Sequence, residues 1–204
     1  NTKPATGNHP PVVRAATLHP SPLVLTGPIL VHVDAQDIDL NPLSFRYQWV
    51  VNGQPLQNQS GERLPPEVLK RGDAVSVEVR PHDGLVEGRS FTLEPLVVGN
   101  SPPVVSRLTI EPESVFPGTR VQARADLSDA DRDMIRVSYR WWKNGMLVQE
   151  GDEAELDTNG FSRGDTVSVE AVPFDGVEKG AAVRSVPIRV GNSPPRFLSA
   201  PAQS

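Results

Sequence analysis

The chain has 204 residues, a net charge of −5, no cysteine and 21 prolines. The lack of cysteine excludes disulfides and thiolate chemistry, and the acidic balance argues against nucleic acid as a partner, because cationic contacts to phosphate supply most of such affinity. No apolar run reaches the roughly 18 residues of a membrane span, and the length suits two domains of ordinary size.

The sequence repeats with a period of 92 residues. The motif Asn8-His9-Pro10-Pro11 returns as Asn100-Ser101-Pro102-Pro103 and opens a third time as Asn192-Ser193-Pro194-Pro195. Residues 10–101 align with residues 102–193 without a gap, and 31 of the 92 positions are identical. A period this long fits a whole domain, not a solenoid turn. We predict one domain over 8–99, a second over 100–191, and a truncated third repeat or C-terminal tail over 192–204.

Several segments of each copy alternate between apolar and polar residues, which is the pattern of a strand with one buried face. In the first copy the apolar members are, in chain order, Ile29, Val31 and Val33, then Phe45, Tyr47 and Trp49, then Val75, Val77 and Val79. The second copy repeats this alternation 92 residues later. We therefore expect Tyr47 and Trp49 to be buried, together with Tyr139 and Trp141.

Turn residues separate these segments at intervals of about 8–12 residues. Asn52-Gly53 and Asn144-Gly145 are strong hairpin signals, and Pro95 and Pro187 in the last strand predict an edge strand or a bulge. No stretch has a helical period. About seven short strands in each copy predict an all-β fold of two tandem immunoglobulin-like β-sandwich domains.

The second copy contains Asp126-Leu127-Ser128-Asp129-Ala130-Asp131-Arg132-Asp133, then Tyr139-Arg140-Trp141 and the Asn144-Gly145 turn. This order resembles bacterial surface repeats of the immunoglobulin-like, PKD-like and cadherin-like kinds. Arg163-Gly164-Asp165-Thr166-Val167-Ser168-Val169 and Asp175-Gly176 resemble their penultimate strand and turn. The Asn-Ser-Pro-Pro motif is similar to a cadherin repeat junction without its acidic residues. The resemblance implies an extracellular or cell-surface sandwich repeat, a fold that serves many roles.

Clustered aspartates make one loop of each copy a candidate calcium site, because Ca²⁺ prefers 6–8 oxygen ligands. The candidate ligands are Asp126, Asp129, Asp131, Asp133 and Asp175 in the second copy, and Asp34, Asp37, Asp39 and Asp83 in the first. An EF-hand is excluded, since Met134 stands where that loop needs glycine. The competing interpretation is that these carboxylates accept backbone N–H groups and stabilise turns.

Arg71-Gly72-Asp73 and Arg163-Gly164-Asp165 spell a cell-adhesion tripeptide. Both copies carry it at the beginning of a predicted strand, where glycine supplies a turn and aspartate a local hydrogen bond. We therefore interpret the tripeptide as a structural turn.

Two features indicate a protein interface. Trp142 has the parity opposite to Trp141, which places it on the outer face of its strand, where the first copy has Val50. A tryptophan there is either an interface anchor or is shielded by Arg140, Arg124 or a loop. The third repeat opening carries Arg196, Phe197 and Leu198, whose apolar side chains have no domain of their own to pack against. We predict that this segment docks on a neighbouring subunit; the alternative is a disordered tail or the cut end of a longer chain.

No catalytic constellation can be assembled. The four histidines, His9, His19, His32 and His82, all lie in the first copy, and neither a nucleophile motif nor a phosphate-binding loop is present. We expect a non-catalytic structural or assembly module of the bacterial envelope or extracellular space: a stalk, spacer or filament-associated subunit. Its partners would be other protein subunits, including further copies joined head to tail. The alternative is an adhesive or carbohydrate-binding module with a calcium-stabilised loop.

Overall fold

A computed structural model describes residues 7–192 of the chain. The chain divides into two compact units, Asn1–Ser101 (unit 1) and Pro102–Ser204 (unit 2). In the described residues of both units the regular structure is β, apart from one short 3-10 turn, η1 (Pro66–Val68), in unit 1. Within the described range, no helix has the length and apolarity required to cross a membrane.

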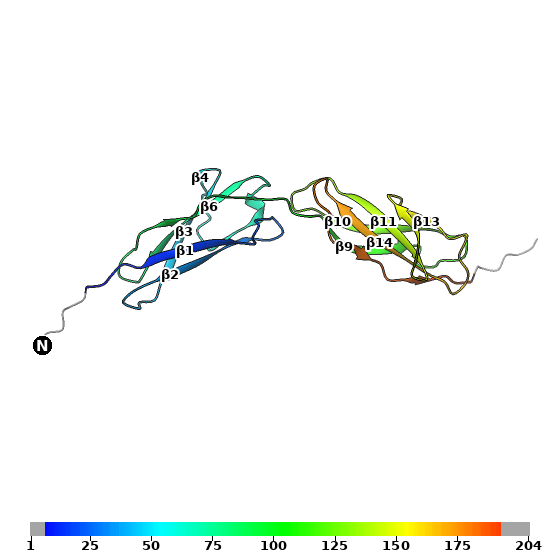
Figure 1. Ribbon diagram of the computed structural model, residues 1–204, viewed down its shortest axis with the longest axis horizontal. Coiled ribbons are helices and arrows are strands. Elements are labelled where there is room, and N and C mark those ends of the chain that lie inside the picture. Colours follow the sequence, from blue (N-terminus) through cyan, green and yellow to red (C-terminus); the bar gives the residue numbers. More distant parts are fainter. Residues whose placement is uncertain (1–6, 193–204) are drawn as a thin grey trace, which may run out of the picture. The chain divides into compact units, whose positions relative to one another are not determined.

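Unit 1 consists of two antiparallel sheets (Figure 1). One has the order β1-β2-β5. The other has the order β4-β3-β6, and both β7 and β8 pair with the far side of β6. The strands are β1 (Val12–His19), β2 (Ile29–Gln36), β3 (Ser44–Val51), β4 (Gln54–Pro55), β5 (Arg63–Leu64), β6 (Ala74–His82), β7 (Phe91–Thr92) and β8 (Leu96–Val97).

Unit 2 repeats this plan, with the sheet orders β9-β10-β13 and β12-β11-β14, and with β15 and β16 both on β14 (Figure 1). The strands are β9 (Val104–Glu111), β10 (Arg120–Ser128), β11 (Arg136–Lys143), β12 (Met146–Gly151), β13 (Glu155–Asp157), β14 (Thr166–Phe174), β15 (Val183–Arg184) and β16 (Ile188–Arg189). Two facing antiparallel sheets make each unit an immunoglobulin-like sandwich. The predicted all-β fold class is confirmed.

Each core is centred on a tryptophan. Trp49 and Trp141 are completely buried, and each indole N–H donates to a carbonyl oxygen, that of Gly61 at 2.9 Å and that of Glu153 at 3.4 Å. Valines of β6 and β14 pack around them. Among the four aromatic residues expected in the cores, Tyr139 is also buried, whereas Tyr47 is only half-buried against the core.

The turns have the expected backbone geometry. Asn52 and Gly53 have φ angles of 51° and 76°, and Asn144 and Gly145 have 48° and 80°, which are the two positive values that a tight two-residue hairpin requires. The last strand of each unit is divided in two around its central proline, giving β7 and β8 in unit 1 and β15 and β16 in unit 2. Proline therefore interrupts the strand without removing it from the sheet.

A close backbone approach binds the Pro-Pro segment to its own unit. A Cβ added to Gly180 would lie 1.8 Å from the carbonyl oxygen of Pro103, and one added to Gly88 would lie 2.0 Å from that of Pro11. Only glycine leaves room for these carbonyls, which explains why both copies have glycine at this position.

Truncating Trp141 to alanine should lower the free energy of unfolding of unit 2 by about 3–5 kcal/mol, because a large aromatic side chain is lost from a packed core. Urea titration followed by circular dichroism measures this effect. Val186→Ala is the matched control, since Val186 is 82% exposed. Equal midpoints for the two variants would contradict the assigned core.

Gly180→Ala should destabilise unit 2 by about 1–3 kcal/mol, the usual cost of overpacking. Gly160→Ala is the control, because a Cβ there would meet nothing within 4 Å. Thermal melting of both variants tests the close approach, and a Gly180→Ala protein that melts with the control would refute it.

Candidate functional site

Three carboxylates meet in the loop between β10 and β11 of unit 2. Ligand oxygens of Asp129, Asp131 and Asp133 all lie within 4.8 Å of one another. Asp129 organises the loop, because its Oδ1 accepts the backbone N–H groups of Asp131 at 2.8 Å and Asp133 at 3.1 Å. Its Oδ2 is buried and has no hydrogen-bond partner. The Oδ1 of Asp129 thus stabilises the turn, as one interpretation of the sequence proposed. Its Oδ2 has no partner and could bind a cation.

The equivalent loop of unit 1 has the same backbone design with fewer charges. Asp37 is 8% exposed, and its Oδ1 accepts the N–H groups of Asp39 at 2.8 Å and Asn41 at 3.2 Å. Its Oδ2 is also buried without a partner. Because Asn41 stands where unit 2 has Asp133, this loop offers one carboxylate less.

The opening motif of unit 1 joins this loop to the turn after β6. The amide of Asn8 donates to Asp83 Oδ2 at 2.6 Å and accepts from the amide of Asn41 at 2.8 Å. The backbone N–H of His9 donates to Asp39 Oδ2 at 2.6 Å, and the His9 imidazole Nδ1 lies 3.2 Å from the same oxygen. Hydrogen bonds therefore occupy much of the polar surface here.

Hydrogen bonding favours the ionised form of two carboxyls in this region. The Asn8 amide, followed by the backbone N–H groups of Val86 and Leu85, lowers the pKa of Asp83 to about 2. The backbone N–H of His9 is the main cause that lowers the pKa of Asp39. The Asp83 carboxylate therefore stays charged over most of the acidic range.

The remaining predicted calcium ligands lie outside the close group. Asp126 and Asp34 are on strands β10 and β2. Asp175 follows β14, and its Oδ1 accepts the backbone N–H groups of Val177 and Glu178. Among the described residues, the structure brings Asp129, Asp131 and Asp133 together as the compact carboxylate group.

The Arg-Gly-Asp tripeptide of unit 2 is a turn, as the sequence suggests. Asp165 accepts the backbone N–H of Ser162 and the amide of Asn144, both at 2.7 Å, and lies 3.1 Å from the Lys143 ammonium. These bonds, the Ser162 N–H first among them, lower its pKa to about 2. Gly164 has a φ of 95°. The carboxylate therefore stabilises its own turn.

Trp142 lies on the outer face of the β12-β11-β14 sheet and is half-buried. The Arg184 guanidinium covers its ring, with the central carbon 4.3 Å from the ring centroid. Its indole Nε1 is buried and has no hydrogen-bond partner. A shield is present, as one interpretation of the sequence proposed, but it comes from β15 and not from Arg140 or Arg124.

Trp142 adjoins an exposed apolar strand. Leu147 on β12 pairs directly with Trp142, and a bulge between Trp141 and Trp142 shifts the register there. Met146, Leu147 and Val148 are 66%, 46% and 45% exposed. We refer to these three residues and Trp142 as the apolar edge.

Unit 1 lacks the apolar edge. Its corresponding residues are Gln54, Pro55, Leu56 and Val50, and its strand β4 has two residues where β12 has six. The sequence pattern singled out Trp142 and the hairpin that leads into β12, but not the exposed apolar side chains of that strand. The difference between the two copies carried the signal, since Gln54 and Pro55 in unit 1 are replaced by Met146 and Leu147 in unit 2.

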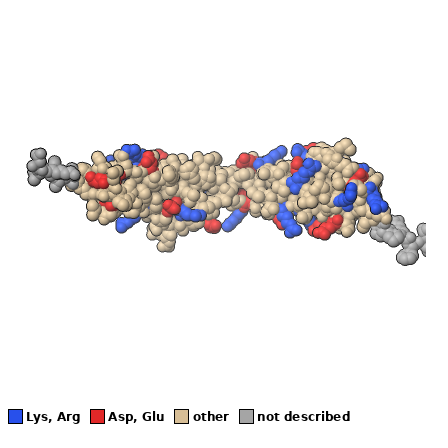
Figure 2. All heavy atoms as spheres, turned by 90° about the horizontal axis from the view of Figure 1, so that it is seen from below, with Lys and Arg blue, Asp and Glu red and all other residues tan. Residues whose placement is uncertain are grey.

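A row of alternating charges runs beside the apolar edge on the same face. Arg140 donates to Glu150 at 2.8 Å and to Glu170 at 3.2 Å. On the face seen in Figure 2, acidic and basic residues are interspersed over both units. Both glutamates of this row therefore have Arg140 as an ion-pair partner.

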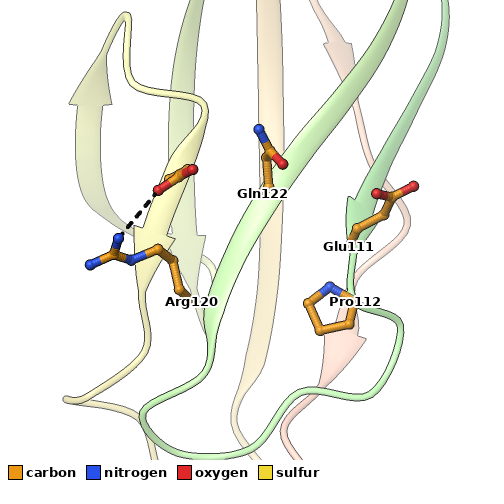
Figure 3. A pocket seen from close by; sticks show the side chains of 5 residues that line it. Glu111, Pro112, Arg120 and Gln122 are labelled. Atoms are coloured by element: carbon orange, nitrogen blue, oxygen red, sulfur yellow. Dashed lines mark ion pairs between the residues drawn. The ribbon is translucent and has the colours of Figure 1, made fainter.

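The outer face of the other sheet of unit 2 has a shallow depression of about 460 Å³ (Figure 3). It is lined by Glu111, Pro112, Arg120, Gln122 and Glu155. Both glutamates have arginine partners, Arg124 for Glu111 at 3.1 Å and Arg120 for Glu155 at 3.8 Å. The depression thus presents paired charges and no nucleophile poised beside a base.

The predicted interface residues Arg196, Phe197 and Leu198 lie outside the described residues. Their part in an interface stays a prediction.

No protein-family model matches the chain, and no curated protein does. Among solved structures, the chicken interferon gamma receptor alpha chain is 14% identical with a TM-score of 0.48, over 88% of this chain and 98% of that one. The fibronectin(III)-like modules of CbhA from Clostridium thermocellum are 16% identical with a TM-score of 0.32, over 87% and 95%. Three N-terminal domains of the bacteriophage RB49 outer capsid protein Hoc are 14% identical with a TM-score of 0.32, over 89% and 59%. Likenesses this low carry no information about function.

Asp83 should make unit 1 more stable at neutral than at acid pH. Its pKa of about 2 in the folded state lies below the roughly 3.9 of an unfolded aspartate. Its stabilising contribution is therefore complete above about pH 4 and is lost as the pH falls towards 2.

Melting temperatures measured between pH 5 and pH 2 test this expectation. Asp83→Asn should be less stable than the parent at pH 5 and should lose less stability on acidification. Glu113→Gln, at an exposed position, should follow the parent. Parallel curves for the parent and Asp83→Asn would refute the assignment.

Proposed function

We propose that this chain is a non-catalytic structural or assembly module of a bacterial cell-surface or extracellular protein. In this role it is a stalk, spacer or filament-associated subunit that acts through protein–protein contacts. The proposal combines the tandem sandwich architecture with the resemblance of its acidic loop, Tyr-x-Trp strand and Asn-Gly turn to bacterial surface repeats.

The apolar edge is the observation that carries the protein-contact part of this proposal. Large apolar side chains that are exposed at a strand edge leave water when a partner covers them, and aromatic residues are enriched among interface anchors. Unit 1 has the same core and turns without this surface, so the fold does not require it. The difference between the copies supports a role in contacts with other molecules.

Sedimentation velocity of the full chain over micromolar to sub-millimolar concentrations tests the assembly role. We expect larger species to form as concentration rises and to weaken in Trp142→Val, which installs the unit 1 residue. Val177→Gln, a change at another exposed apolar residue of unit 2, should assemble like the parent. A chain that remains monomeric at every concentration would refute self-assembly.

The close carboxylate group supports a second candidate, an adhesive or carbohydrate-binding module with a calcium-stabilised loop. Asp129, Asp131 and Asp133 offer hard oxygen ligands of the kind Ca²⁺ prefers, and the unpartnered Oδ2 of Asp129 would gain a partner. Sugar binding has less support, because Arg184 already covers the ring of Trp142.

Calcium should raise the melting temperature of unit 2, because a ligand that binds only the folded state stabilises it. At a calcium concentration one hundred times the dissociation constant, the free energy of unfolding should rise by about 2.7 kcal/mol. Asp129→Asn should remove the effect, and Asp126→Asn should keep it because Asp126 lies outside the close group. Scanning calorimetry with calcium and with chelator makes this measurement. Identical melting in both would leave turn stabilisation as the role of these aspartates.

A further inference from the structure

We propose that β12 accepts Pro194–Ala200 of a second copy of this chain as an added antiparallel strand. This inference rests on the proposed assembly role and names the two surfaces that would meet. Three properties of unit 2 carry it: an open strand edge, the order of apolar and acidic residues along that edge, and the strand directions in the sheet.

The β12 edge is open to another strand. β12 is the last strand in its sheet order, and β11 is its only strand partner among the described residues. The outward N–H and C=O groups of such a strand form a template for pairing with another chain. Unit 1 has Pro55 at the corresponding edge position, where proline is a common protection against strand addition. Unit 2 has Leu147 in its place.

The side chains along β12 change character from one end to the other. Met146, Leu147 and Val148 form an exposed apolar half, and the exposed acidic residues Glu150, Asp152 and Glu153 follow at and just beyond its other end. A complementary strand running antiparallel needs a basic residue first and apolar residues next.

The segment after Asn192 has this order. Arg196 precedes Phe197 and Leu198, so an antiparallel alignment places the guanidinium near the acidic end and both apolar side chains beside Leu147 and Val148. The five residues from Arg196 to Ala200, which follow the two prolines, span about 17 Å when extended, most of the length of the six residues of β12. The matching positions after the two earlier Pro-Pro motifs begin strands β1 and β9.

The strand directions require the segment to come from another copy. β16 and β11 run in the same direction, because both are antiparallel to β14. The start of β14 lies beside the ends of β16 and β11. Val190, just after β16, donates its N–H to the carbonyl of Asp165, and Asn144, just after β11, donates its N–H to the carbonyl of Thr166. β12 starts at this end, so its acidic residues lie toward the opposite end.

The chain also leaves β16 at the end where β12 starts. To pair antiparallel with its own β12, the chain would have to travel the length of that strand, about 20 Å, before Arg196. The three residues Ser193–Pro195 span only about 10 Å. A second copy meets no such limit, and repeated addition would join copies head to tail.

Sedimentation velocity of the full chain tests whether the β12 edge is the docking surface for a second copy. Leu147→Pro, which installs the residue of unit 1, should weaken self-association at least about tenfold, whereas Val177→Gln should not change it. Circular dichroism confirms that the variants fold. Phe197→Ser combined with Leu198→Ser is the second test, because it leaves every described residue unchanged and should give the same loss.

A charge exchange tests direction and partner together. Arg196→Glu and Glu150→Arg should each weaken association by roughly fivefold, about 1 kcal/mol for an exposed ion pair. An equimolar mixture of the two single variants should recover mixed dimers, since a glutamate tail can then meet an arginine edge on another copy.

The outcomes separate this inference from the proposed function. Association that persists unchanged in Leu147→Pro and in the tail variant would overturn docking on β12 and leave the assembly role intact. Variants that lose association, with no recovery in the mixture, would overturn the antiparallel arrangement. A parent chain that stays monomeric would overturn both proposals.

Discussion

The whole architecture depends on a buried indole held by one hydrogen bond in each unit. A chain without cysteine cannot tie its two sheets together covalently, so Trp49 and Trp141 occupy the volume between them. Their N–H groups reach the carbonyls of Gly61 and Glu153, each twelve residues further along the chain. A buried, satisfied donor fixes the strand's register, because a slip by one residue would bury the wrong face. Trp142 faces outward as a direct result of Trp141 facing inward.

The sequence predicted those parts of the fold that depend on local pattern. Strand parity identified the tryptophan cores, Asn-Gly identified the hairpins, and the 92-residue period identified the duplication. Features that depend on distant partners were missed. Arg184, which covers Trp142, is 42 residues away, and Asn8 joins two turns whose aspartates lie far along the chain. The acidic loop was recognised, yet only three of its predicted ligands form a compact group, because Asp126 belongs to a strand.

The duplication provides an internal reference for interpreting the surface. Both copies keep the central tryptophan, the hairpin glycines and the turn aspartates, so the fold requires these residues. The outer face of the sheet containing β12 differs between the copies: Val50 corresponds to Trp142, and Pro55 to Leu147. One copy has a short strand ending in proline and the other a long apolar edge. A single domain would not have allowed this separation of residues that the fold requires from surface residues that are free to differ.

Only Pro102 separates the last residue anchored in unit 1 from the first residue anchored in unit 2. The Ser101 hydroxyl is buried in unit 1, where it accepts the N–H of Leu25 at 2.9 Å, and two residues later the Pro103 carbonyl lies close against Gly180 of unit 2. A protease needs several residues of extended, accessible chain, and here such a length is released only when one of the units partly unfolds. Limited proteolysis should therefore spare this junction, and the units can be separated by genetic means only if Ser101 stays with the first and Pro103 with the second.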